Sequence, residues 1–209
     1  MSQPLRGAAL LKFIRLLHSY SSMLVLVLLL FFAITGITLN HPDSLYSSAG
    51  KYSRQQTLSL PLQFQLTKLP EADKEQALLA RQLRDWLQRE HDVKASEFTY
   101  LFEPKELLLE MDFKRPAGYA SVIVDFNEHT AELDLEFGGY LALMNDLHKG
   151  RYAGFSWKML IDATALACII FSLTGFYLIL KQNSRRSIGN CLAMLGIFIS
   201  LLAYVLSLH

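Results

Sequence analysis

The chain has 209 residues, which is enough for one or two domains. Apolar residues make up 52% and charged residues 19% of it, whereas about a quarter of the residues of a typical globular protein are charged. This composition excludes a disordered chain and, with the apolar runs described next, a fully water-soluble protein. The formal net charge of +1 comes with no basic face, so we expect no nucleic-acid partner. Both cysteines, Cys168 and Cys191, lie in apolar runs, which excludes a disulfide framework.

Three apolar runs predict three membrane spans. Residues 16–39, 163–180 and 187–208 contain no Asp, Glu, Lys or Arg, and a helix needs about 20 such residues to cross a bilayer. We expect the spans at 16–39, 154–180 and 187–208. The first run resembles a signal peptide in its basic start, but it is long for one and no small-residue cleavage site follows it, which favours an uncleaved anchor.

The distribution of charge predicts the orientation in the membrane. The segments 1–15 and 181–186 each contain three basic residues and no acid, so both are expected on the cytoplasmic side. The segment 40–153 contains 13 basic and 18 acidic residues, a net charge of −5. It is expected on the opposite side of the membrane, as one external domain.

Segment 40–153 is expected to fold as an α+β domain. Residues 71–91 place four large apolar side chains on one helical stripe, namely Leu79, Leu83, Trp86 and Leu87. Four strand-like runs follow, at 97–102, 106–113, 119–126 and 130–137. The last run alternates apolar and acidic residues, and residues 127–129 before it predict a hairpin turn. We therefore expect one helix packed on a small antiparallel sheet.

Three histidines lie where the first two spans meet the membrane surface, and imidazole is a common ligand of haem iron. His18 and His41 are 23 residues apart, about 34 Å along a helix, so they cannot share one iron. His41 and His148 are expected at the same depth on the outer side and can share one iron, with Lys149 and Arg151 pairing with the haem propionates. A single interfacial histidine is more often a hydrated side chain at the membrane surface than a ligand. Spacing alone leaves both interpretations open, the haem ligand and the hydrated side chain.

Small residues accompany these histidines in the first two spans. They are Thr35, Gly36, Thr38, Thr174 and Gly175. Such residues let a flat macrocycle or another helix approach closely.

Carboxylates of the domain are candidate ligands for ferric iron, because a hard cation prefers oxygen donors. Asp43 and Asp146 lie near the ends of the domain, and the run 130–137 adds Glu132, Asp134 and Glu136. An acidic stripe is more often a solvated face, which is the alternative here.

The second span also contains an ionisable residue, Asp162. An ionisable side chain in a span is a functional hypothesis by default. Lys158 stands four residues earlier, so an ion pair near the interface is the structural alternative.

The sequence around the histidines resembles the PepSY-associated transmembrane family. The resemblance is carried by LLHSY…AITGITLNH in the first span and by LHKGRYAGFSWKMLIDATALACIIFSLTGFYLIL at the second. In that family a His opens the first helix, and an L-H-x-G-x-x-x-G phrase leads into a helix that ends in S-L-T-G. The resemblance covers most of the chain and extends to a helix-plus-hairpin PepSY fold. Three spans place it in a short branch, similar to Vci-type inner-membrane ferric reductases, without the further histidine-bearing helices of longer relatives.

The resemblance implies haem b, one or two per functional unit, bound by His41 and His148 on one side and by His18 on the other. It implies a ferric reductase that acts on ferric iron or ferric chelates and supports a ferrous iron transporter. The chain has no flavin or nicotinamide motif, so a separate cytoplasmic reductant, such as a flavin, is expected as donor. His18 has no partner histidine on its side within one chain, so we expect a homodimer with a shared haem, a monomer being the alternative.

Two other functions remain open at this point. One is a non-catalytic, membrane-anchored PepSY module that binds or restrains a partner such as a periplasmic protease. The other is an accessory subunit of a transporter. A visible haem spectrum distinguishes the reductase from both.

Overall fold

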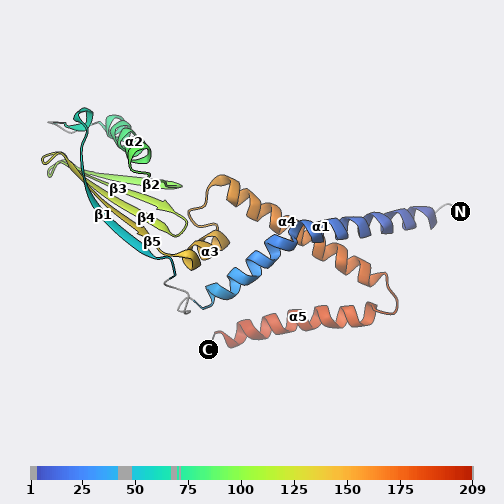
Figure 1. Cartoon of the computed structure of the whole chain (residues 1–209). Helices are drawn as coiled ribbons and strands as arrows, with labels where there is room; N and C mark the ends of the chain where they lie inside the picture. Colours follow the sequence, from blue (N-terminus) through green and yellow to red (C-terminus); the bar gives the residue numbers. More distant parts are fainter. Residues whose placement is uncertain (1–3, 42–48, 67–69, 71, 209) are drawn as a thin grey trace. The chain divides into compact units, whose positions relative to one another are not determined.

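The computed structural model describes residues 4–41, 49–66, 70 and 72–208 (Figure 1). The chain divides into two compact units. The helical unit comprises Met1–Phe31 and Leu160–His209, and the sheet unit comprises Phe32–Met159. The boundary between the units therefore falls within two long helices, after Phe31 in one and after Met159 in the other.

Within the described residues, three helices are long and apolar enough to cross a membrane, as the sequence predicts. They are α1 (Pro4–Leu39), α4 (Phe155–Leu180) and α5 (Arg186–Leu206). Helix α1 begins well before the charge-free run. Its 36 residues span about 54 Å, more than the roughly 30 Å of a hydrocarbon core, so the first turns of α1 extend beyond that core.

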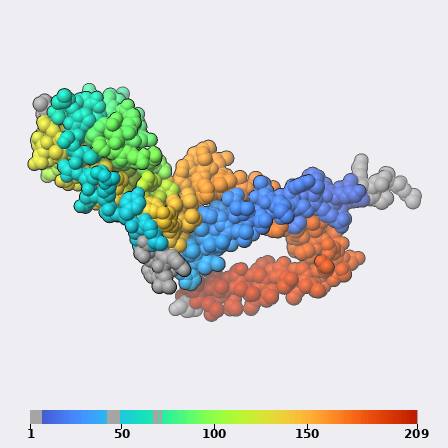
Figure 2. All heavy atoms as spheres, in the orientation of Figure 1, coloured from blue at the N-terminus to red at the C-terminus, as the bar shows by residue number. Residues whose placement is uncertain are grey.

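The long helices expose apolar side chains and bury small or polar ones. In α1, Leu24 and Val27 are 73% and 74% exposed, whereas Ser21 is buried. In α4, Thr164, Ala167 and Thr174 are buried. This inverted pattern suits a lipid solvent, where small and hydroxyl-bearing residues mark the contacts between helices. All residues of α5 except Gly189 are exposed, and its side chains form the red surface in Figure 2.

The sheet unit contains an antiparallel sheet of five strands within the described residues, in the order β1-β5-β4-β3-β2 (Figure 1). The strands are β1 (Tyr52–Ser59), β2 (Glu97–Glu103), β3 (Leu108–Arg115), β4 (Gly118–Asp125) and β5 (Thr130–Phe137). The helices that belong wholly to this unit are α2 (Asp73–Glu90), α3 (Tyr140–Lys149) and the short 3-10 helix η1 (Leu62–Phe64). The predicted helix and the four predicted strands are confirmed, each within two residues at either end.

Helix α2 covers one face of the sheet and closes the hydrophobic core. Its predicted stripe is confirmed, because Leu79, Leu83, Trp86 and Leu87 are all buried. They belong to one cluster with the inward side chains of β3, β4 and β5, which include Leu109, Met111, Phe113, Val122, Val124 and Leu133. The alternation of apolar and polar residues along the strands thus buries one face and leaves the other polar.

Strand β1 and helix α3 were not predicted. Strand β1 is polar in sequence, YSRQQTLS, and lies at the edge of the sheet, where it pairs with β5 from Tyr52↔Phe137 to Ser59↔Thr130. Helix α3 is only ten residues long and lies between two glycines with positive φ, Gly139 at 92° and Gly150 at 64°. It carries His148, which the sequence analysis had placed only as a residue preceding the second span.

Candidate functional site

The ring of His148 lies against the last turns of α1 within the sheet unit. Its Nδ1 is 2.6 Å from Oγ1 of Thr35, and its ring meets Phe32 edge-on at 5.3 Å between centroids. A methyl group at Gly36 would lie 3.6 Å from Cε1 of His148. The imidazole therefore occupies a defined seat on α1, although Thr35 and His148 are 113 residues apart.

Helix α3 is fixed in the rotation that turns His148 toward α1. Thr38 donates a hydrogen bond of 2.9 Å to Oδ1 of Asn145, one turn before His148 on α3. Nε1 of Trp157 donates to the carbonyl of Leu147 at 2.8 Å, which satisfies a C-terminal carbonyl of the helix. Gly150 then ends the helix in the left-handed conformation that favours glycine.

The ring of His18 lies against α4 within the helical unit. Its Nδ1 is 3.1 Å from the carbonyl oxygen of Phe171 and 3.1 Å from Oγ1 of Thr174. The imidazole stacks on the ring of Phe171, with 4.7 Å between centroids and 12° between planes. A methyl group at Gly175 would lie 3.0 Å from Cε1 of His18.

These contacts define which nitrogen of each ring is available as a ligand. A carbonyl oxygen only accepts hydrogen bonds, so Nδ1 of His18 donates to Phe171, and Nε2 of the neutral ring keeps its lone pair. Nδ1 of His148 is 2.6 Å from the hydroxyl of Thr35, and this hydroxyl is also 3.3 Å from the carbonyl of Phe32. When the hydroxyl donates to the carbonyl, its oxygen accepts from Nδ1, and Nε2 keeps its lone pair. Metal-bound histidines usually have this arrangement, with one nitrogen oriented by a hydrogen bond and the other on the metal. The donor set therefore fits haem ligation through Nε2.

His41 has the same tautomer but a different setting. It follows α1, is exposed, and its Nδ1 bonds to the carbonyl of Ile37 at 3.0 Å. Among the described residues, no hydrogen bond or ring contact joins His41 to His148. The proposed pairing of His41 with His148 remains a prediction.

The basic residues predicted to meet haem propionates lie beside His148. Lys149 is in the last turn of α3, and Arg151 follows the glycine that ends this helix. Both side chains are exposed. In the part of the chain that the structure describes, neither forms an ion pair. Their charge is thus available to an anionic group.

The predicted carboxylate ligands of ferric iron are dispersed. Asp43 lies outside the described residues. Asp146 accepts a hydrogen bond of 2.8 Å from the backbone N–H of Ala117, which ties α3 to the turn between β3 and β4. No group of three or more His, Cys, Asp or Glu side chains suited to a metal ion occurs among the described residues. Asp162 in α4 and Lys158 are both exposed.

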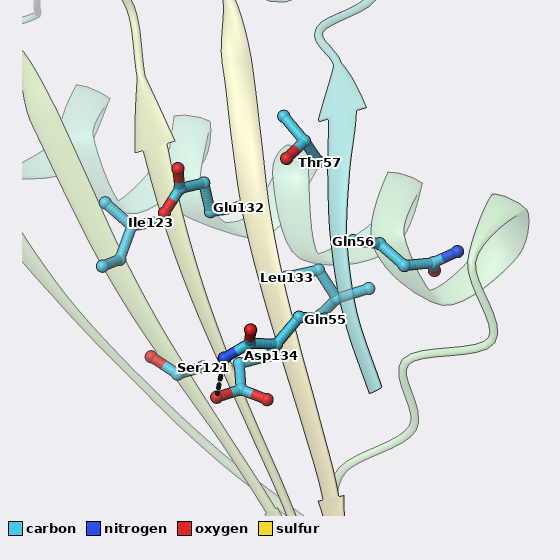
Figure 3. A pocket seen from close by; sticks show the side chains of 8 residues that line it. All are labelled: Gln55, Gln56, Thr57, Ser121, Ile123, Glu132, Leu133 and Asp134. Atoms are coloured by element: carbon cyan, nitrogen blue, oxygen red, sulfur yellow. Dashed lines mark hydrogen bonds between the residues drawn. The ribbon is translucent and has the colours of Figure 1, made fainter. Parts of the chain in front are cut away.

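The face of the sheet that α2 leaves open carries the remaining acids. Glu132 and Asp134 line a hollow of about 430 Å³ with Gln55, Thr57, Ser121 and Ile123, as Figure 3 shows from close by. Gln55 donates to Oδ2 of Asp134 at 3.3 Å, and Oδ1 of Asp134 is buried without a partner. The neighbouring Glu136 is exposed.

Tyr119 and Asp112 form a second polar contact on this open face. The phenol of Tyr119 donates a hydrogen bond to Oδ1 of Asp112. This bond, followed by burial, raises the pKa of Tyr119 above its ordinary value of 10.0. The contact therefore favours the protonated phenol at alkaline pH and leaves its state at neutral pH unchanged.

The small residues of the spans were predicted to permit close approach, and their contacts with the histidines were not predicted. The contacts of Phe171, Phe32 and Asn145 were not predicted either. A signal was present in the sequence, since a Thr-Gly dipeptide occurs in both of the first two spans, as AITG and SLTG.

A comparison with protein families matches almost the whole chain. The family model described as putative PepSY_TM-like matches residues 9–209. No curated protein and no solved structure matches the chain. The matched range includes the three candidate histidines and residues of both units.

Proposed function

The chain belongs to the putative PepSY_TM-like family, and from this premise we propose that it is a haem b-containing electron carrier of the inner membrane. It reduces ferric iron, or a ferric chelate, on the periplasmic side in support of ferrous iron uptake. The observation that carries the proposal is the setting of His18 and His148. Each ring is held at Nδ1 on a helix that can span the membrane, an arrangement that suits ligation through Nε2.

Haem, when bound, supplies one-electron chemistry between its ferric and ferrous states. His148 and His41 would hold it through Nε2 on the periplasmic side, and Lys149 and Arg151 would neutralise its propionates. Thr35 holds the ring of His148 in place with a 2.6 Å contact. The overall reaction consumes one electron for each ferric ion, and a cytoplasmic reductant such as a reduced flavin supplies it.

The ferric substrate would meet an acid-rich domain. Segment 40–153 has a net charge of −5 from 13 basic and 18 acidic residues, which raises the local concentration of cations. Asp43 and Asp146 stay candidates for transient contact with the ion, together with Glu132, Asp134 and Glu136. Ferrous iron then leaves for a transporter, because it binds these hard oxygen donors less strongly than ferric iron does.

The test of the haem site is a pair of histidine variants in the purified full chain. His148→Ala and His41→Ala should each abolish bound haem or convert a low-spin spectrum to a high-spin one, since removal of an axial ligand leaves iron with an open position. His129→Ala is the matched control, because His129 lies in the exposed turn before β5. Full haem content and an unchanged low-spin spectrum in both variants would refute the assignment.

Electron transfer across the membrane requires a second haem, on the cytoplasmic side, with His18 as a ligand. A hydrocarbon core of about 30 Å separates the two surfaces, and His18 has no partner histidine on its own side. In a two-fold homodimer, two His18 rings near the axis would hold one shared haem. The mass of the complex in nanodiscs and the haem content per chain test this. A monomer that keeps full activity after His18→Ala contradicts it.

The second candidate function is a non-catalytic PepSY module that binds or regulates a periplasmic protease or a transporter. The observation that favours it is the open face of the sheet, with its hollow lined by Glu132 and Asp134. Colour separates the two functions. The reductase shows a b-type Soret band after purification in detergent, whereas a binding module is colourless.

A further inference from the structure

We propose that two Thr-Gly dipeptides are positioning elements, each of which holds one histidine of another helix in a single orientation and tautomer. Thr174-Gly175 holds His18, and Thr35-Gly36 holds His148. The inference deepens the proposed function and rests on it only for what the two rings bind. The contacts that carry it lie within the helical unit for the first pair and within the sheet unit for the second.

The threonine acts through a hydroxyl whose hydrogen is already used. Thr174 donates to the carbonyl of Ile170 at 2.7 Å, and Thr35 donates to that of Phe32 at 3.3 Å. Each oxygen therefore presents lone pairs to the imidazole, at 3.1 Å from His18 and 2.6 Å from His148. An acceptor at this place requires Nδ1 to carry the proton, and this leaves Nε2 as the ligand atom.

The glycine acts through the side chain that it lacks. Glycine follows threonine directly in both dipeptides, so it adjoins the hydroxyl on the helix surface and leaves a flat seat for the ring. Cε1 of His18 is 3.0 Å from the place of a methyl group at Gly175, and Cε1 of His148 is 3.6 Å from the corresponding place at Gly36. The hydroxyl orients one nitrogen while the bare backbone admits the ring carbon beside it.

The two glycines differ in the distance from the place of a Cβ to the histidine ring, so the same substitution should have different effects at the two positions. A Cβ at 3.0 Å is closer than ordinary contact, so the ring of His18 has to move by a few tenths of an ångström, which lengthens its hydrogen bonds or loosens its stacking on Phe171. A Cβ at 3.6 Å is in ordinary van der Waals contact. Gly175→Ala should therefore displace the ring of His18, whereas Gly36→Ala should leave the ring of His148 in place.

The competing explanation is that the threonines only bond to their own helix, as hydroxyls in membrane helices commonly do. Thr164 provides the control for this explanation. It is buried on the same helix as Thr174 and donates to the carbonyl of Leu160 at 2.7 Å. No hydrogen bond from Thr164 to a histidine occurs among the described residues.

The test uses the haem-free full chain in detergent micelles, with the histidine rings labelled with nitrogen-15. The chemical shifts of Nδ1 and Nε2 show which nitrogen is protonated, and a His→Gln variant of each histidine assigns the signals. In the unaltered chain, both His18 and His148 should carry the proton on Nδ1. Thr35→Val should convert His148 alone to a mixture of tautomers, because it removes the hydroxyl beside Nδ1. Thr174→Val leaves the carbonyl of Phe171 as an acceptor 3.1 Å from Nδ1 of His18, so it should shift the Nδ1 signal of His18 alone and keep the proton on that nitrogen.

Three controls make this outcome specific. Thr174→Ser keeps the hydroxyl and should restore the original Nδ1 signal of His18, whereas Thr164→Val should change neither ring. Gly175→Ala should disturb His18, and Gly36→Ala should leave His148 unchanged. The inference is overturned if Thr35→Val leaves the tautomer of His148 intact and Thr174→Val leaves the Nδ1 signal of His18 unchanged. It is also overturned if each variant disturbs both rings equally, since that result indicates general loss of packing.

Haem binding is measured separately, so the two proposals fail independently. Loss of a group that orients a metal-bound histidine weakens metal binding about 10- to 100-fold, and Thr35→Val should weaken haem binding to this extent, with rescue by Thr35→Ser. A chain that binds no haem but shows the predicted tautomers refutes the proposed function and supports the positioning role. A chain that binds haem equally well with and without the hydroxyls, with unchanged tautomers, refutes the positioning role alone.

Discussion

A hydroxyl in a hydrocarbon environment costs free energy unless both its hydrogen and its lone pairs have partners. Thr35 and Thr174 meet this condition with a backbone carbonyl on one side and an imidazole on the other. The same contacts satisfy a polar nitrogen of each histidine. At the scale of single residues, the polar groups of the spans are therefore arranged in pairs that specify each other's orientation.

Charge beside His148 gives the first prediction. Lys149→Gln combined with Arg151→Gln should lower the midpoint potential of the haem, because positive charge nearby disfavours the ferric state, which carries one more positive charge than the ferrous state. Spectroelectrochemical titration measures the shift. Lys105→Gln, in the exposed turn between β2 and β3, is the control. An unchanged potential in the double variant would mean that these two side chains serve only to set topology.

The contact between Tyr119 and Asp112 gives a prediction about pH. Its hydrogen bond to Asp112 raises the pKa of Tyr119 above 10.0 in the folded chain. The contribution to stability is complete below the unfolded value near 10 and is lost as pH rises through the folded pKa. Asp112→Asn should move the pKa of Tyr119 downward, which a titration of its ring carbon signals by NMR detects. A pKa that stays in place would assign the shift to burial instead.

At the scale of elements, helix α3 is a short helix that its end residues and its neighbours stabilise. Ten residues form no stable helix on their own. Here the glycines at 139 and 150 adopt positive φ at the two ends, while Thr38 and Trp157 bond to Asn145 and Leu147. The helix is thus defined by its caps and its neighbours more than by its own sequence.

Gly150 gives the prediction at this scale. Gly150→Ala should destabilise the sheet unit by about 1–2 kcal/mol, because alanine is strained in the left-handed conformation at φ 64°. Thermal unfolding of the full chain in detergent measures the loss. Gly150→Asn should recover part of it, since Asn tolerates this conformation. Gly154→Ala is the control, because no atom lies within 4 Å of the place of its Cβ; equal losses at both positions would contradict the argument.

At the scale of the whole molecule, the charge asymmetry predicts the orientation. The link 181–186 carries three basic residues and no acid, whereas segment 40–153 has a net charge of −5. In a chain with Cys168 and Cys191 replaced by Ala, Ser53→Cys should react with a membrane-impermeant maleimide in intact spheroplasts. Ser184→Cys should react only after the membrane is permeabilised. The reverse order of labelling would contradict the predicted topology.

The sequence by itself determined the three spans, the amphipathic helix α2 and four of the strands. These elements are encoded locally. A span requires about 20 apolar residues in a row, and the stripe of Leu79, Leu83 and Trp86 repeats at helical spacing. Strand β5 shows its two faces directly in the alternation of Ala131, Glu132 and their neighbours.

Only the tertiary structure decided strand β1, helix α3 and the seats of the histidines. Strand β1 has a polar sequence and becomes a strand because β5 offers it an unpaired edge. Thr35 and His148 are 113 residues apart, and Thr174 and His18 are 156 apart. The sequence contains both Thr-Gly dipeptides and both histidines, but hydrogen bonds over such separations depend on how the helices pack, which no local pattern encodes.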